Sequence, residues 1–442
     1  MIDQAPWSAY QKLVLCLAAL GFLVDGIANQ TLGLAVPSLM ADWRAPREAF
    51  ASVTAIGLVG LTIGAALGGM VGDRIGRRLM LIFSTALFGL MTMGAATAHD
   101  VGALFWFRLV DGLGIGAMIP NGAAMISEFT PQRRRSRAIA LGMVFIAIGA
   151  VLAGAVATPI LPAYGWRTLF FILGALPVGL ALVFAFLLPE SPRFLARRPG
   201  RITDLKKILG RCGLGLADGA QVAEAGPAAS NPSWRRILFD KDVRPTTLAL
   251  WTGFFFCLLA SYSMFSWVPV MLKSLGLPLS MTSLGLTVFG IGGVAGGVAS
   301  GWLIERSGLR LATLGLAAGG IVAALLLGAL THGGVGNPVA LFSALAVQGF
   351  FISGLHNGLY TISAFIYPDY GRATGVGAAA AVGRLGAIAS SYAGLIALQL
   401  GGASGYFVLI AAALTASLMA IALTSRVVLH APSSPAVTAP AA

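Results

Sequence analysis

The sequence predicts an all-α membrane protein in which twelve transmembrane helices form two six-helix pseudo-repeats. This prediction rests on an apolar composition along nearly the whole chain, on twelve stretches long enough to cross a bilayer, and on a charged loop motif that occurs twice. The chain of 442 residues is 57% hydrophobic and 10% charged, whereas a soluble domain carries about 25% charged residues. Its 58 glycines suit membrane helices, in which small residues allow close packing.

A spanning helix needs about 20 mostly apolar residues. The first such stretch is too long for the core of a signal peptide and lacks a cleavage pattern of small residues, so we interpret it as a spanning helix too. The predicted spans cover residues 13–36, 51–71, 79–98, 101–126, 138–161, 168–188, 246–271, 280–303, 310–331, 339–366, 374–399 and 404–425.

Composition divides the chain into four parts. Residues 1–188 form an N-terminal six-helix bundle and residues 246–426 a C-terminal one. The polar segment 189–245 between them is a cytoplasmic linker. The Pro-, Ala- and Ser-rich tail 427–442 is predicted to be disordered.

The positive charges predict the orientation in the membrane, because cytoplasmic loops carry an excess of Lys and Arg. The predicted inner loops hold most of the 29 lysines and arginines. The outer loops hold only Arg44, Arg47, Arg167 and Lys273. We therefore expect a multi-pass protein of the inner membrane with both termini in the cytoplasm, surrounded by lipid. The net charge of +13 is explained by this topology and indicates no nucleic-acid partner.

The two halves resemble each other in sequence. GGMVGDRIGRR (68–78), between the second and third spans, recurs as SGWLIERSGLR (300–310) between the eighth and ninth. A weaker match links PNGAAM (120–125) with HNGLYT (356–361). Two repeated halves predict a transporter whose binding site lies near the bilayer midplane between them.

Several motifs carry a resemblance to a known family. The loop GDRIGRR resembles the signature of the major facilitator superfamily, and the resemblance covers nearly the whole chain. The other motifs together are similar to the aromatic acid:proton symporter family; they are DG (25–26), RLVDGLGIGAMIPN (108–121), GWR (165–167), PESPRFL (189–195), YPDYGRATGVG (367–377) and GRLGAI (383–388). This resemblance implies the major facilitator fold and a proton-coupled carrier of small aromatic carboxylates.

The first helix departs from the family pattern. The family typically has DGxD here, whereas this chain has Asp25, Gly26, Ile27 and Ala28, so the second acid is missing. Substrate choice or proton stoichiometry can differ from typical members for this reason.

Asp25 is the main candidate for proton coupling. It lies near the middle of the first span, where a charge costs about 2.5–3.5 kcal/mol on insertion scales. A carboxyl that is neutral in one state and ionised in another has the property that a proton carrier requires. The alternative is an aspartate that hydrogen-bonds the nearby backbone and only orders the Gly26 region.

Arg384 is the main candidate for substrate binding. Its guanidinium can hold a carboxylate through two parallel hydrogen bonds, and the adjacent Gly383 and Gly386 are expected to leave room for a ligand. The alternative is a structural partner for an acid on another helix.

Arg108 and Asp111 are spaced to face each other on the fourth helix. We favour a mutually compensated pair, with the alternative that Asp111 replaces the missing acid in proton coupling.

Polar and aromatic side chains in the predicted spans are candidates to complete an aromatic-acid site. For each aromatic residue alone, packing against lipid or core is the simpler interpretation, and His356 could equally be a packed, neutral histidine. The candidate substrate-binding residues besides Arg384 are Asn29, Gln30, Asn121, Tyr262, Phe265, Trp267, His356, Asn357 and Tyr360, with Gln348 as a further possibility.

The charged loop between the second and third spans is predicted to act as a gate. In relatives this loop holds the cytoplasmic side shut through charge pairs, and Glu128 is a candidate partner for one of its arginines. The candidate gating residues are Asp73, Arg74, Arg77, Glu128, Glu305 and Arg306, together with Arg78. In the linker, ITDLKKIL (202–209) could form a helix that lies on the membrane through Ile202, Leu205 and Leu209.

The sequence therefore predicts a proton-coupled importer of a small aromatic carboxylate, of the benzoate, hydroxybenzoate or protocatechuate type, that works by alternating access as a monomer. A proton-coupled exporter remains an alternative, and a transporter-like sensor is a further one. No nucleophile–base set, phosphate loop or metal-ligand spacing is present in the sequence, and Cys16, Cys212 and Cys257 lie far apart. We expect no enzyme activity, no cofactor and no metal.

Overall fold

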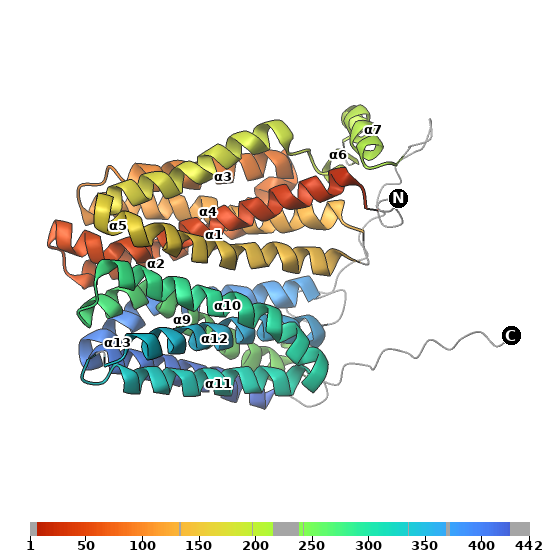
Figure 1. Cartoon of the computed structure of the whole chain (residues 1–442). Coiled ribbons are helices and arrows are strands. Elements are labelled where there is room, and N and C mark those ends of the chain that lie inside the picture. The colour runs from red at the N-terminus through yellow and green to blue at the C-terminus, as the bar shows by residue number, and fades with distance from the viewer. Residues whose placement is uncertain are drawn as a thin grey trace.

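The computed structural model describes residues 7–131, 134–196, 198–214, 238–241, 243–334, 336–367 and 372–424. Two helical bundles lie side by side, one from each half of the chain (Figure 1). The predicted tail and much of the predicted linker lie outside the described residues.

The first bundle contains α1 (Ala9–Trp43), α2 (Arg47–Ile75), α3 (Arg77–Ala95), α4 (Val101–Phe129) and α5 (Arg135–Leu187). After it come the short α6 (Pro192–Ala196), a 3-10 turn (Pro199–Arg201) and α7 (Ile202–Arg211). The second bundle contains α9 (Arg244–Ser274), α10 (Leu279–Ser307), α11 (Leu309–Leu330), α12 (Pro338–Ile366) and α13 (Arg372–Leu423).

Two of these elements each consist of two helices joined at a glycine. α5 is interrupted at Gly165 (φ 77°) and α13 at Gly402 (φ 57°), which lie in the left-handed region that favours glycine. In the described part of the chain, ten elements are long and apolar enough to cross a membrane, and the two interrupted ones supply two crossings each. The prediction of twelve transmembrane helices is therefore confirmed.

The two ends of the molecule contain different segments of the chain. The start of α1, the end of α2, α6 and α7 lie together at one end, which we call the terminal end (Figure 1). The turn between α1 and α2 and the breaks at Gly165 and Gly402 lie at the other, which we call the loop end. At the loop end, Asp42 of α1 accepts hydrogen bonds from Trp166 Nε1 and Arg167 Nη1, each at 3.0 Å. The GWR motif therefore joins α5 to α1.

The repeat in the sequence is also a repeat in packing. A Cβ added to Gly64 of α2 would lie 2.2 Å from the carbonyl oxygen of Leu113, and one added to Gly296 of α10 would lie 1.9 Å from that of Phe350. Real Cβ atoms do not approach so closely, so only glycine permits these backbone contacts. The α2–α4 and α10–α12 pairs thus use the same close glycine packing, as small residues do in membrane helix pairs.

The linker helix α7 forms where it is predicted but not on the predicted surface. Leu205 and Leu209 are buried, together with Ile208, in the core of the first bundle, whereas Ile202 is exposed. Arg211 lies over the ring of Tyr10 at 5.6 Å. We therefore correct the prediction of a helix lying on the membrane: its apolar face packs on the first bundle at the terminal end.

We predict that Gly64→Val lowers the melting temperature of the purified protein, because the new Cβ would collide with the Leu113 carbonyl. Overpacking of this kind costs about 1–3 kcal/mol. The matched control is Gly315→Val in α11, where no atom lies within 4 Å of the added Cβ. Equal melting temperatures for the two variants would contradict the packing assigned to the α2–α4 pair.

Candidate functional site

Asp25 is fully buried in the middle of α1. Among the described residues, neither of its carboxylate oxygens has a hydrogen-bond partner. The neighbouring Gly26 packs directly on α5, since its added Cβ would lie 2.0 Å from the carbonyl oxygen of Ile146. Gly26 therefore serves helix packing by itself, and no contact with Asp25 is needed to order it.

Arg384 extends from α13 to the opposite bundle. Its Nη1 donates a hydrogen bond to the carbonyl oxygen of Leu61 in α2 at 3.1 Å. The guanidinium also interacts electrostatically with Asp25, Tyr262 and Tyr360. Four groups from α1, α9, α12 and α13 thus surround one region between the halves, and we call Asp25, Tyr262, Tyr360 and Arg384 the central cluster.

The glycines beside Arg384 do not leave space for a ligand, contrary to the prediction from the sequence. A Cβ on Gly386 would lie 2.0 Å from the carbonyl oxygen of Phe255, and one on Gly383 would lie 3.0 Å from Leu258. Both glycines bring α13 against α9.

Aromatic rings continue the central cluster within the second bundle. Tyr360 packs edge-on against Phe254 at 5.0 Å and beside the His356 ring at 5.1 Å. Tyr262 lies 6.4 Å from Phe265, measured between ring centroids. Tyr360 is 38% exposed, so one of its surfaces is open to a ligand.

The polar candidates on α1 and α12 differ in how many of their polar atoms have hydrogen-bond partners. Among the described residues, His356 Nε2 and Gln30 Oε1 have no hydrogen-bond partner. Asn29 lies one helical turn beyond Asp25 and is half-buried. Gln348 is fully buried, and both polar atoms of its amide lack a partner in the described part of the chain.

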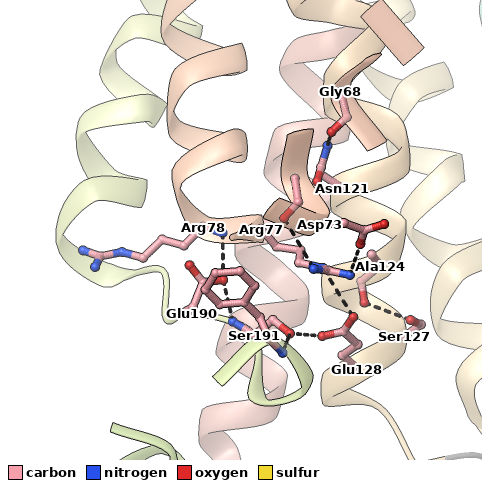
Figure 2. Close-up of polar contacts among 12 residues, drawn as sticks. Gly68, Asp73, Arg77, Arg78, Asn121, Ala124, Ser127, Glu128, Glu190 and Ser191 are labelled. Carbon is pink, nitrogen blue, oxygen red and sulfur yellow. Dashed lines mark hydrogen bonds and ion pairs between the residues drawn. The ribbon is translucent and has the colours of Figure 1, made fainter. Parts of the chain in front are cut away.

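Two asparagines among the candidate substrate residues are used in helix packing. Asn121 donates to the carbonyl oxygens of Gly68 and Ala117, each at 2.9 Å, and therefore joins α4 to α2 (Figure 2). Asn357 donates to Gly297 at 3.1 Å and joins α12 to α10 in the same manner.

Trp267 is only 2% exposed and packs on α13, where a Cβ on Gly394 would lie 2.5 Å from its ring. In this conformation neither its ring faces nor the Asn121 amide are available to a substrate. We therefore correct the prediction that Trp267 and Asn121 bind the substrate.

Arg108 and Asp111 form the buried ion pair that their spacing predicts. Arg108 Nη1 contacts Asp111 Oδ2, and Thr92 donates to Oδ1 at 3.2 Å. Both oxygens of Asp111 are thus engaged, unlike those of Asp25. This geometry favours mutual compensation over a role for Asp111 as a replacement acid.

A second group of charges lies at the terminal end, and we call Asp73, Arg77, Glu128, Glu190 and Ser191 the terminal cluster (Figure 2). Arg77 pairs with Asp73, and its Nε lies 3.5 Å from Glu128 Oε1. The expected ion pair between Glu128 and an arginine of the loop is therefore present. The Ser191 hydroxyl donates to Glu128, so the linker joins the same network.

The segment that follows α5 makes contacts that the sequence analysis did not predict. Glu190 Oε1 accepts hydrogen bonds from the backbone N–H groups of Arg78 (3.2 Å) and Ser191 (2.8 Å), which places a carboxylate at the start of α3. Arg198 donates to the backbone carbonyl of Arg74 at 2.6 Å, at the end of α2. Glu190 and Ser191 of the PESPR motif were the sequence signal that could have predicted these contacts.

The second half repeats only part of this arrangement. Arg78 donates to the carbonyl of Ala185 at the end of α5, and Arg310 donates to that of Ala422 at the end of α13, so each arginine caps a helix C-terminus. Arg306 instead lies over the ring of Trp302 at 5.2 Å, and Glu305 is exposed.

Hydrogen bonds connect the two halves in the middle of the molecule and at the loop end. Among the described residues there are two: Arg384 to Leu61 in the middle, and Gln399 Nε2 to Glu48 Oε1 (2.5 Å) at the loop end. At the terminal end, Asp73 pairs within its own half and its side chain is 62% exposed. In the described part of the chain, the hydrogen bonds between the halves thus lie in the middle and at the loop end, and Asp73 at the terminal end is exposed.

Comparison with known proteins agrees with this geometry. The profile of the Major Facilitator Superfamily matches residues 18–335 and 250–441. The chain belongs to the major facilitator superfamily. As a member, it is a multi-pass membrane transporter and not an enzyme.

Two individual members of the superfamily show which of its transporters this chain resembles in sequence. The chain is 34% identical to the gallate transporter of Pseudomonas putida, over 99% of this chain and 97% of that protein. It is 31% identical to the 4-hydroxybenzoate transporter PcaK of Pseudomonas aeruginosa, over 90% and 89%. The resemblance to the aromatic acid:proton symporter family is thereby confirmed.

A solved structure of a superfamily member supports the fold. The xylose transporter XylE from E. coli, in a partially occluded inward-open conformation, matches with a TM-score of 0.72 at 18% identity, over 93% of this chain and 97% of that one.

We predict that Arg108→Leu alone lowers thermal stability strongly, because it leaves Asp111 buried without its partner. Breaking a buried pair in this way costs about 3–5 kcal/mol. The double variant Arg108→Leu/Asp111→Leu should recover most of the loss, since no uncompensated charge remains. Thermal melts of the purified variants measure both effects. A double variant no more stable than the single one would contradict the assignment of a compensated pair.

Proposed function

We propose that this transporter imports a small aromatic carboxylate, of the benzoate, hydroxybenzoate or protocatechuate type, together with protons across the inner membrane. The observation that carries the proposal is the central cluster: a buried carboxyl, without a hydrogen-bond partner among the described residues, and a guanidinium lie in one region between the halves. The gallate and 4-hydroxybenzoate transporters among its relatives support the substrate class.

In this proposal the guanidinium of Arg384 binds the substrate carboxylate. An arginine offers two parallel N–H groups to a carboxylate, which fixes orientation as well as charge. The rings of Tyr262, Phe265 and Tyr360 offer faces and edges for an aromatic ring, and His356 and Asn29 lie at its border. Among the described residues, Gln30 Oε1 and both amide atoms of Gln348 lack hydrogen-bond partners, so they are available to hydroxyl groups of a substrate.

Asp25 carries the proton. In an apolar region the neutral acid is favoured, and contact with water or with the positive charge of Arg384 favours the carboxylate. When the substrate occupies Arg384, this positive charge is neutralised and Asp25 binds a proton more readily. Uptake of the anion and of the proton are coupled through this electrostatic link between the two side chains.

Transport follows alternating access, in which the two bundles rock about the central cluster. In this proposal both termini lie in the cytoplasm, so the terminal end faces inward, and the exposed Asp73 side chain there supports a conformation that is open to the cytoplasm. The terminal cluster serves as the inner gate. In the outward-facing state Asp73, now exposed, would contact the second bundle and hold the terminal end closed.

We predict that Asp25→Asn abolishes proton-driven accumulation of radiolabelled 4-hydroxybenzoate in proteoliposomes while leaving binding measurable by thermal shift. Arg384→Ala should abolish the thermal shift as well, because it removes the carboxylate's partner. Asp204→Asn, which changes an acid of α7 outside the spans whose side chain is 45% exposed, serves as the control and should accumulate substrate normally. If both Asp25→Asn and Arg384→Ala accumulate substrate normally, the proposed function is wrong.

The missing acid at Ala28 leads to a prediction about charge. A monoanion that moves with one proton carries no net charge, whereas each net charge would gain about 2.3 kcal/mol per 100 mV of membrane potential. We therefore expect transport that depends on the pH gradient alone. Solid-supported-membrane recordings should show no substrate-dependent current, and Ala28→Asp offers a variant with the family pattern. Currents that rise with substrate in the unaltered protein would contradict electroneutral transport.

An exporter with the same fold is the second candidate, because the geometry of the site does not determine direction. Accumulation inside right-side-out vesicles under an inward proton gradient distinguishes import from export. A transporter-like sensor would bind substrate and accumulate none.

A further inference from the structure

A cavity at the loop end shares no residue with the central cluster. Its volume is about 560 Å³, and it lies where the end of α1, the break in α5, the end of α9 and the start of α10 meet, so both halves line it. Small-molecule sites typically have volumes of about 300–1,000 Å³. We call this space the outer cavity.

Two cations line the outer cavity, one from each half. Arg167 Nη1 lies 3.0 Å from Asp42 Oδ2, and its guanidinium lies over the Trp166 ring at 4.2 Å. The charge of Arg167 is therefore matched by an acid that also lines the cavity. Lys273 of α9 is exposed and has no ion-pair partner in the part of the chain that the structure describes. One unmatched positive charge thus remains at the outer cavity.

The position of this charge is unusual for a membrane protein. In the proposed orientation the loop end faces outward, where lysines and arginines are depleted. The predicted outer loops hold four of them, Arg44, Arg47, Arg167 and Lys273, and the last two line the outer cavity. Lys273 also lies in the last turn of α9, where a cation stabilises a helix C-terminus. That role needs only a basic residue and does not account for the cavity beside it.

A small aromatic anion suits the outer cavity. A lysine ammonium is a mobile point charge with three donors, so it attracts a carboxylate without fixing its orientation. Buried Pro37 and Leu161 supply apolar lining, and the Tyr164 ring is 72% exposed and offers a surface to an aromatic ring. A neutral molecule would gain only the apolar contacts.

We propose that the outer cavity is a capture site, at which Lys273 collects the carboxylate of an aromatic acid before the acid reaches the central cluster. This inference rests on the proposed function, which supplies both the substrate class and the orientation. An exposed ion pair is weak in water, and a charge attracts an anion over roughly 10 Å at 0.1 M salt. The captured anion pairs with α9 alone. Lys273 therefore concentrates substrate at the entrance without holding the two halves together.

The kinetic test is uptake of radiolabelled 4-hydroxybenzoate into right-side-out vesicles. Lys273→Gln should raise KM about threefold at low ionic strength and leave kcat unchanged, because the lost charge acts on the approach of the anion and not on the central cluster. High salt should remove the difference, since it screens the charge. Lys273→Arg should keep the parent KM. The matched control is Arg47→Gln, which removes an outer cation that does not line the cavity and should leave KM unchanged.

Occupancy of the outer cavity is tested by thiol labelling. Ala41 is exposed and lines the cavity, so Ala41→Cys places a reporter there. The background has Cys16, Cys212 and Cys257 replaced by serine, and methyl methanethiosulfonate serves as a small neutral reagent. Saturating 4-hydroxybenzoate should slow labelling at position 41, whereas 4-hydroxybenzyl alcohol, which lacks the carboxylate, should not. His332→Cys, at the loop end but outside the cavity, should show no protection.

Two substitutions in the Ala41→Cys background separate the outer cavity from the central cluster. Lys273→Gln should abolish the protection by 4-hydroxybenzoate. Arg384→Ala, which removes the carboxylate's partner in the central cluster, should leave the protection intact. Labelling in nanodiscs of phosphatidylcholine, with and without phosphatidylglycerol, shows whether an anionic lipid headgroup occupies the cavity instead.

The outcomes distinguish the capture site from the proposed function. If the parent accumulates 4-hydroxybenzoate but Lys273→Gln has the parent KM, capture by Lys273 is refuted while the transport function stands. Protection that is lost in Arg384→Ala and kept in Lys273→Gln also refutes it, because it would then arise from the central cluster. Protection by phosphatidylglycerol and none by 4-hydroxybenzoate would assign the cavity to lipid. A parent that accumulates no aromatic carboxylate refutes the proposed function itself.

Discussion

A hydrocarbon environment offers no water to a polar side chain, so each buried polar group must find its partner within the protein. Most of the buried polar groups in this transporter do so. Asp111 engages both oxygens with Arg108 and Thr92, and Glu190 accepts two backbone N–H groups. Asp25 is the exception among the buried carboxylates, since both of its oxygens lack partners among the described residues. The same constraint thus separates structural charges from the carboxyl that we propose changes its protonation.

The two halves share their packing and differ in their chemistry. Close glycine contacts join α2 to α4 and α10 to α12, and Arg78 and Arg310 cap equivalent helix ends. The Arg77–Glu128 ion pair belongs to the first half only. The second half supplies Arg384 and both tyrosines of the central cluster. The repeated features build the fold, and the unrepeated ones give each half its part in the proposed transport cycle.

Several features could be read from the sequence because they depend on local composition. The apolar stretches predict the helices, and the charge spacing in α4 predicts the Arg108–Asp111 pair. The prediction that Glu128 pairs with a loop arginine also holds, because both lie at the ends of neighbouring helices. Each of these features is decided within one helix or between helices that follow closely in the chain.

Other features depend on which helix faces which, and there the sequence was insufficient. Gly386 suggested room for a ligand but packs against Phe255, and Trp267 suggested a ring face but is covered by α13. A glycine or an aromatic residue in an apolar stretch has the same local pattern whether it faces a cavity or a neighbouring helix. Only the contact partner distinguishes these cases, and it can lie more than a hundred residues away.

The sequence by itself determined the membrane class, the repeated halves and the family, because hydropathy and short motifs are properties of the chain. The tertiary structure decided that Asp25 is left without a partner among the described residues, that the guanidinium of Arg384 reaches the carbonyl of Leu61, and that the linker joins the terminal cluster through Ser191. These depend on distances between segments that are remote in the chain, and they arise only when the two bundles are assembled.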